Sequence, residues 1–199
     1  MMKSRMYDST KLNFIKLLKL FEDSVEDVVA ITRAFSIAYV IHRGKFYDNI
    51  RSEPYINHTL RVALILASEL KIKDKDVIIA AILHDAFEKT YTNPFEADLL
   101  KKIIGDKALN LIFSTTKFNI KNMESNEYCK LVLKSSNSKI IRYLILANRL
   151  DSIRILKSSI HKDKIQRFKK ETQEYFLPIA NLTDDNLVFK LSVAMYELK

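Results

Sequence analysis

Two histidines, an aspartate and an asparagine stand inside stretches of this chain that are otherwise strongly apolar. His84 and Asp85 end one uninterrupted apolar run, Asn148 ends another, and His58 follows Pro-Tyr-Ile-Asn. Burying a neutral polar group costs about 2–7 kcal/mol unless a partner compensates it. Imidazole and carboxylate are common ligands of divalent metal ions. We therefore predict that these residues gather around an ion. The alternative is that each is an ordinary hydrogen-bonded core residue.

Three of these side chains would make a site with room for chemistry. His58, His84 and Asp85 supply two imidazole nitrogens and a carboxylate. Three protein ligands leave positions open for water and substrate, as in catalytic metal sites. Glu88 follows Asp85 on the same face of the expected helix. We predict that Glu88 orients or deprotonates the water.

Other chemistries have little support in the sequence. The chain contains no Gly-x-Ser-x-Gly motif, and Cys129 lies in an ordinary amphipathic stretch. Only two glycines are present, which excludes a glycine-rich phosphate loop. His42 and His161 are interpreted as a helix-end residue and a surface residue rather than as ligands.

The composition predicts an all-α fold. With two Gly and three Pro in 199 residues, the chain has little material for the turns of a β fold. Apolar residues recur with helical periodicity, and we expect one helical bundle domain over residues 1–199. The expected helices are 10–22, 25–43, 55–70, 74–88, 94–104, 106–117, 124–135, 138–157, 161–176 and 184–197.

The charge and the cysteine content restrict the partners and the compartment. The formal net charge of +9 favours a polyanionic partner. The lysines are spread along the chain, however, so nucleic-acid binding is the least favoured of three readings. No apolar run reaches the roughly 20 residues of a membrane span, and no signal peptide is recognisable. The single cysteine fits a reducing cytoplasm, while the oligomeric state is left open.

Several separate motifs, in order along the chain, resemble one family, the HD-domain hydrolases of the RelA/SpoT type and especially the small stand-alone alarmone hydrolases. The resemblance runs from about residue 30 to about residue 181. It implies an all-α fold, a Mn²⁺-type ion and removal of pyrophosphate from the 3′ position of ppGpp. It also implies relatives that act on other phosphorylated nucleotides and relatives that have lost activity. The matching blocks are 42–44, 53–58, 80–85, Glu88, Thr90, 116–117, 147–150 and 171–180.

The resemblance also exposes two changes near the expected ion. His58, His84 and Asp85 match three of the family's four metal ligands, but the fourth, an aspartate in the family, is Asn148 here. An amide oxygen can still bind a metal, although without the charge that attracts it. Asp151, close to one helical turn later, can replace the missing ligand; alternatively it only pairs with a nearby arginine.

The family's acidic pair is changed as well. Glu88 matches its first residue, and Lys89 stands in place of the second. Together with Asn148, this makes the pocket more positive by about three charge units. If Lys89 points inward it repels an ion and attracts phosphate; if it points outward it is a surface residue that suits a helix end.

Three residues are predicted to contact the substrate. The family's basic stretch before Glu-Pro-Tyr-Ile-x-His holds the guanine base, and here it reads Lys-Phe-Tyr-Asp-Asn-Ile-Arg. Tyr47 or Arg51 from this stretch can stack on a base, and Arg149 is the third candidate. The favoured function is a metal-dependent nucleotide phosphohydrolase. The runner-up is a degenerate HD domain that binds a phosphorylated nucleotide without turnover.

Overall fold

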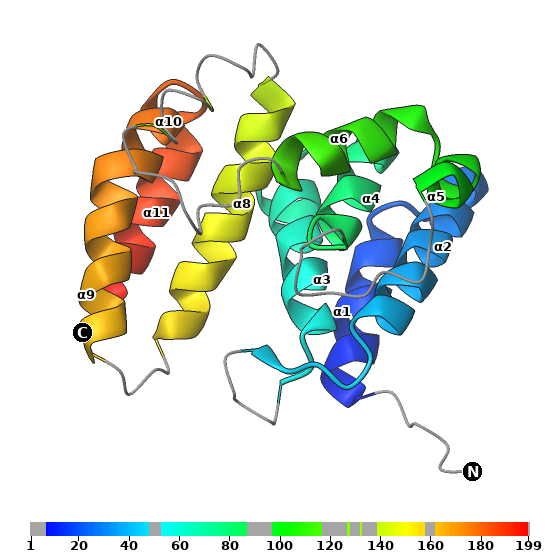
Figure 1. The fold of residues 1–199 in the computed structure, drawn as a ribbon, viewed down its shortest axis with the longest axis horizontal. Helices are drawn as coiled ribbons and strands as arrows, with labels where there is room; N and C mark the ends of the chain where they lie inside the picture. Colours follow the sequence, from blue (N-terminus) through cyan, green and yellow to red (C-terminus); the bar gives the residue numbers. More distant parts are fainter. Residues whose placement is uncertain are drawn as a thin grey trace. The chain divides into compact units, whose positions relative to one another are not determined.

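The computed structural model describes residues 7–47, 53–86, 97–116, 127, 132, 139–157 and 162–198. Regular structure in these residues is helical, which confirms the all-α prediction, and an isolated antiparallel bridge joins Phe46 to Pro54. The helices gather into two compact units, residues 1–116 and 117–199 (Figure 1). That the two units form one domain stays a prediction.

The first unit is built around a helix that is buried on every side. Its elements are α1 (Asp8–Lys19), α2 (Val25–Ile41), α3 (Ile56–Leu64), the π-helical turn η2 (Ile65–Glu69), α4 (Lys75–Leu83), α5 (Ala97–Ile104) and α6 (Asp106–Thr116). Helix α4 contacts α2, α3 and α6, and residues 77–83 are at most 2% exposed. An uninterrupted apolar run is what such an enclosed helix requires.

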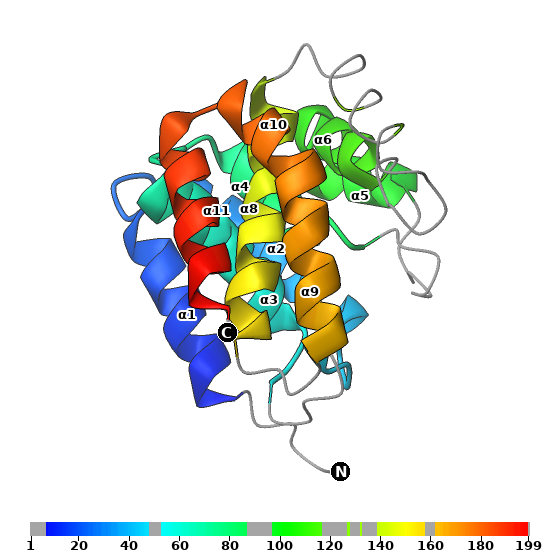
Figure 2. The ribbon, with the colours of Figure 1, turned by 90° about the vertical axis from the view of Figure 1, so that its left-hand side faces the viewer.

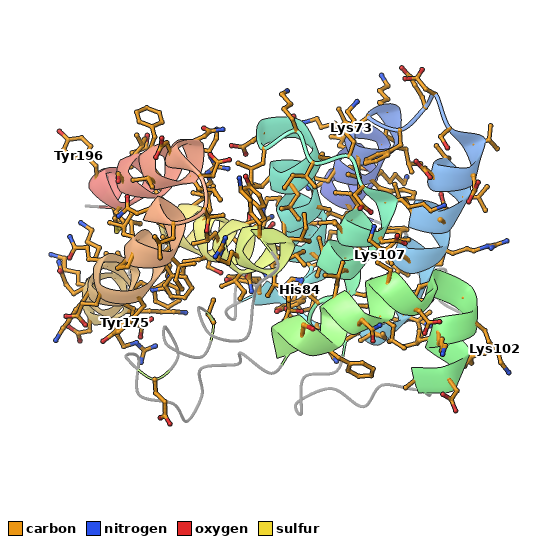
Figure 3. All side chains as sticks on the ribbon, turned by 90° about the horizontal axis from the view of Figure 1, so that it is seen from above. Lys73, His84, Lys102, Lys107, Tyr175 and Tyr196 are labelled. Carbon is orange, nitrogen blue, oxygen red and sulfur yellow. The ribbon has the colours of Figure 1, made fainter. Side chains whose placement is uncertain are left out.

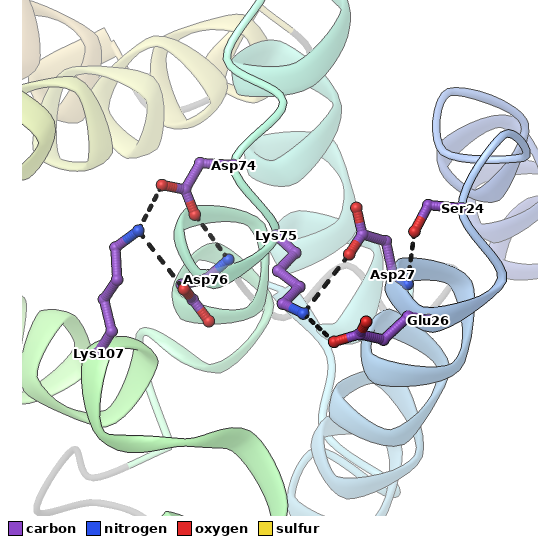
Figure 4. A network of polar contacts seen from close by, with 7 residues as sticks. All are labelled: Ser24, Glu26, Asp27, Asp74, Lys75, Asp76 and Lys107. Atoms are coloured by element: carbon purple, nitrogen blue, oxygen red, sulfur yellow. Dashed lines mark hydrogen bonds and ion pairs between the residues drawn. The ribbon is translucent and has the colours of Figure 1, made fainter.

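Polar contacts fix the start of α4 against its neighbours. Asp74 caps the helix by accepting a hydrogen bond from the backbone N of Asp76 at 3.0 Å. Its other oxygen pairs with Lys107 of α6 at 2.6 Å, and Lys75 pairs with Glu26 of α2 at 2.5 Å (Figure 4). Exposed pairs of this kind contribute about 0–1 kcal/mol each, so they position α4 less than its apolar surface does.

The second unit is built around the long helix α8. Its elements are α8 (Lys139–Leu156), α9 (Lys162–Glu171), the π-helical turn η4 (Thr172–Phe176), α10 (Leu177–Asn181) and α11 (Asp185–Glu197). Helix α8 contacts α11, α10 and η4, and it lies beside α11 (Figure 2). Pro178 lies in the first turn of α10, which directly follows η4.

Most expected helix boundaries lie within three residues of those in the structure. Helix α10, which directly follows η4, is not among the expected helices, and two expected helices differ from the structure or fall outside the described residues. The helix expected over 74–88 ends at Leu83, directly before His84. The helix expected over 124–135 falls mostly outside the described residues. Within the part of the chain that is described, no helix is both long and apolar enough to cross a membrane.

Candidate metal centre

The end of α4 sets the orientation of His84. The Nδ1 atom of His84 lies 2.8 Å from the carbonyl oxygen of Ala81. A carbonyl oxygen only accepts, so Nδ1 carries the proton and donates it. This bond competes for the oxygen that a continuing α-helix would offer to the backbone N of Asp85, and α4 ends at Leu83. The expected helix is therefore wrong over 84–86, while residues 87 and 88 lie outside the described part of the chain. The lone pair of His84 is left on Nε2.

His58 comes from the first turn of α3, which α1 holds in place. The backbone N of His58 donates to the carbonyl oxygen of Tyr55 at 2.9 Å, and the ring is 2% exposed. The neighbouring Asn57 accepts from Thr10 Oγ1 at 2.6 Å and donates to Ser9 Oγ at 3.0 Å. Because Asn57 is buried and bonded to α1, the first turn of α3 has little freedom to rotate.

The structure brings His58, His84 and Asp85 together. One ligand atom from each lies within 4.8 Å of the others. Oδ2 of Asp85 is 3.1 Å from His84 Nε2 and 4.0 Å from His58 Nε2. Ligand atoms held at about 2.0–2.2 Å by one ion lie up to about 4.4 Å apart. Small side-chain movements would therefore suffice to coordinate one ion.

The charges in this cluster favour a cation. A neutral His84 turns the lone pair of Nε2 toward the carboxylate oxygen of Asp85, and two lone pairs at 3.1 Å repel each other. A proton or a metal ion between them removes that repulsion. Burial by itself raises the pKa of Asp85, but the interactions with His84, His58 and Tyr55 lower it overall. Asp85 is thus a carboxylate at neutral pH, and two imidazoles with one carboxylate suit a divalent ion.

Aromatic rings surround these three residues. The ring centre of Tyr47 is 5.2 Å from that of His58 and 5.7 Å from that of Tyr55, whereas His42 lies 4.9 Å from Tyr55. Tyr47 thus lies beside the cluster. His42 is the residue at the C-terminal end of α2 and is 2% exposed.

The sequence reading missed Tyr55. Its hydroxyl donates a hydrogen bond to Oδ2 of Asp85 at 2.5 Å. The only local signal is the Pro-Tyr dipeptide one turn before His58, and nothing in it points to a residue thirty positions away.

Several other predicted site residues lie outside the described residues or in the second unit. Glu88, Lys89 and Arg51 lie outside the described residues. Asn148 and Asp151 lie in α8 of the second unit, where Asp151 is 1% exposed. Their roles as a weak fourth ligand and as its replacement stay predictions.

Arg149 makes a full set of contacts inside the second unit. Its Nε donates to Thr172 Oγ1 at 2.9 Å, and Nη2 donates to the carbonyl oxygen of Phe168 at 2.8 Å and to Glu171 Oε2 at 3.0 Å. The guanidinium carbon lies 4.1 Å and 4.4 Å from the ring centres of Phe168 and Phe176. These contacts favour a structural role for Arg149 over the predicted contact with substrate.

The HD domain family matches residues 34–184 of the chain. A relative from Aquifex aeolicus, named guanosine-3′,5′-bis(diphosphate) 3′-pyrophosphohydrolase, is 34% identical over 83% of this chain and 23% of its own length. The bifunctional (p)ppGpp synthase/hydrolase SpoT of Escherichia coli is 28% identical over 88% of this chain and 24% of its own length. The chain thus spans about a quarter of these bacterial relatives.

Smaller animal proteins are similar over more of their length. The Drosophila melanogaster 3′-pyrophosphohydrolase MESH1 is 32% identical over 58% of this chain and 63% of its own length. A solved structure described as "A metazoan ortholog of SpoT hydrolyzes ppGpp and plays a role in starvation responses" superposes with a TM-score of 0.69. It covers 85% of this chain and 97% of that one at 23% identity, which supports the fold. The chain belongs to the HD-domain family.

Proposed function

We propose that the chain is a metal-dependent phosphohydrolase that removes pyrophosphate from the 3′ position of ppGpp or of a related nucleotide. The observation that carries this proposal is the convergence of His58, His84 and Asp85, whose ligand atoms lie within 4.8 Å of one another. Support for the substrate comes from the relatives in Aquifex and Drosophila, which are both named for hydrolysis of guanosine bis(diphosphate).

The proposed ligands are His58 Nε2, His84 Nε2 and the Asp85 carboxylate, with the amide oxygen of Asn148 as a weak fourth. Mn²⁺ is the proposed ion because the resemblance to the alarmone hydrolases implies it, and carboxylate ligands suit it. When bound, a divalent ion activates a water molecule and holds a phosphate oxygen. Glu88 is proposed to orient that water.

The substrate would lie against the aromatic side of the cluster. The ring of Tyr47, 5.2 Å from that of His58, offers a face on which a guanine base can stack. Arg51 is proposed to add a cation nearby, and the basic net charge of +9 favours a phosphorylated ligand. We also expect the protein to act in the cytoplasm, in keeping with its single cysteine.

The second candidate is a degenerate HD domain that binds a phosphorylated nucleotide without turning it over. Asn148 and Lys89, which replace two carboxylates of the family pattern, favour this alternative. Both changes weaken attraction for a cation, and Lys89 strengthens attraction for phosphate.

The direct test is pyrophosphate release from ppGpp with excess Mn²⁺, with the His84→Ala protein as the blank. We expect release above the blank and its loss when EDTA removes the metal. Release no greater than that of His84→Ala, with ppGpp still bound, would reject the hydrolase in favour of the binding protein.

A double variant separates the two candidates further. Asn148→Asp with Lys89→Asp restores the family's acidic set. A working hydrolase should change its turnover only modestly, because its own residues already support the reaction. A large rise from near zero would show that the natural chain is degenerate.

A further inference from the structure

The hydroxyl group of Tyr55 contacts a carboxylate oxygen of Asp85 that also lies near both candidate histidine ligands. Tyr55 Oη donates to Oδ2 of Asp85 at 2.5 Å. The same oxygen lies 3.1 Å from His84 Nε2 and 4.0 Å from His58 Nε2. Tyr55 therefore fixes the carboxylate oxygen that is nearest to both imidazoles.

Contacts of its backbone and its ring hold Tyr55 in place. The backbone N of Tyr55 donates to the carbonyl oxygen of Lys45 at 2.9 Å, and its own carbonyl oxygen accepts from His58 N at 2.9 Å. The ring packs against His42 at 4.9 Å and Tyr47 at 5.7 Å between ring centres. Backbone and ring are thus both held, so the hydroxyl meets Asp85 with little loss of side-chain entropy.

We propose that Tyr55 is a positioning residue that holds the Asp85 carboxylate in the orientation that a divalent ion requires. The inference rests on the metal site proposed above. A phenol suits this task because it donates a hydrogen bond without a positive charge that would compete with the ion. A carboxylate has lone pairs for about four partners, so the bond from Tyr55 leaves others for the metal. Hydrogen-bond partners of metal-binding carboxylates typically change metal affinity by about 10–100-fold when removed.

The test is a Mn²⁺ titration of the Tyr55→Phe protein without nucleotide, followed by electron paramagnetic resonance. We expect the dissociation constant for Mn²⁺ to rise by about 10–100-fold. Each titration is made at a temperature well below the melting temperature that the same protein shows in EDTA. The measured affinity then refers to folded protein. This readout does not depend on turnover, and a merely structural tyrosine would not change it.

Tyr143→Phe is the matched control. Tyr143 donates its hydroxyl to Oδ2 of Asp184 at 2.6 Å in the second unit, so this variant loses a similar bond to a carboxylate that is not a proposed ligand. Its Mn²⁺ affinity should equal that of the wild type. An unchanged affinity in Tyr55→Phe, or an equal loss in both variants, would overturn the role of Tyr55.

The same titration separates this inference from the proposed function. If the wild type binds Mn²⁺ and His84→Ala does not, the metal site stands and Tyr55→Phe alone decides the inference. If the wild type binds no Mn²⁺, or His84→Ala binds it equally well, the metal site falls and the inference falls with it.

Discussion

Each unit of this protein contains a buried polar cluster, and the two clusters are built in opposite ways. Around Arg149, hydrogen-bond donors meet acceptors at 2.8–3.0 Å and aromatic rings flank the guanidinium. Around Asp85, two imidazole nitrogens and a carboxylate oxygen face one another. A buried positive charge whose hydrogen-bond acceptors come from the same unit stabilises the fold. Ligand atoms that converge are suited to bind a cation, as at a functional site.

The largest expected effect comes from removing one of the converging ligands. His84→Ala should lose the rise in melting temperature that Mn²⁺ gives the wild type, because ligands stabilise only the state that binds them. Differential scanning fluorimetry with and without Mn²⁺ measures this. Arg149→Lys is the control from the other cluster and should keep the shift. A full shift in His84→Ala would mean that the metal binds elsewhere.

Removing Arg149 should instead weaken the fold. Arg149→Ala loses three hydrogen bonds and the packing on two rings, and it leaves Glu171 without its buried partner. We expect the free energy of unfolding to fall by about 3 kcal/mol, as measured by urea denaturation. Unchanged unfolding together with weaker nucleotide binding would support the predicted contact of Arg149 with substrate.

Acid should destabilise the first unit, which contains the buried His42, and spare the Arg149 cluster of the second. Burial lowers the pKa of His42 from 6.5 to about 4, whereas arginine stays charged at all accessible pH values. Between these two pKa values the unfolded chain binds a proton that the folded protein does not. The stability due to neutral His42 is therefore complete above about pH 6.5 and is lost as the pH falls toward 4, by roughly 3 kcal/mol in total.

Urea denaturation in EDTA at several pH values measures this loss. His42→Gln should flatten the wild-type profile between pH 6.5 and pH 4 by a similar amount. An equally steep profile in His42→Gln would assign the acid sensitivity to other groups.

The smallest effect is expected at the exposed pairs of α4. Lys107→Ala removes the contacts with Asp74 and Asp76 and should lower the free energy of unfolding by less than about 1 kcal/mol. Lys102→Ala, at an exposed position on α5 (Figure 3), is the control for loss of a surface charge. A much larger loss in Lys107→Ala would show that buried polar clusters are not the main polar contributors.

The sequence alone predicted the fold class and the convergence of His58, His84 and Asp85. The apolar run before His84 requires an enclosed helix, and polar groups at the end of such a helix must find partners inside the protein. The same argument applied to Asn148 and Arg149, which also follow an apolar run. The apolar runs alone could not show which cluster finds its partners inside the protein, because the acceptors of Arg149 come from residues 168–172, which are distant in the sequence.

Two further features depend on contacts that periodicity does not encode. Helix α4 ends at Leu83, where the His84 ring donates to the carbonyl oxygen of Ala81, and the pattern of apolar residues contains no sign of this bond. The contact of Tyr55 with Asp85 joins the start of α3 to the end of α4. Both contacts arise only when the helices are assembled.

Diffraction from crystals grown with Mn²⁺, measured at the manganese absorption edge, would locate the ion directly. We predict an anomalous peak about 2.2 Å from His58 Nε2, His84 Nε2 and the Asp85 carboxylate, and no peak beside Arg149. The absence of a peak among His58, His84 and Asp85 at saturating Mn²⁺ would contradict the assignment of this cluster as a metal site.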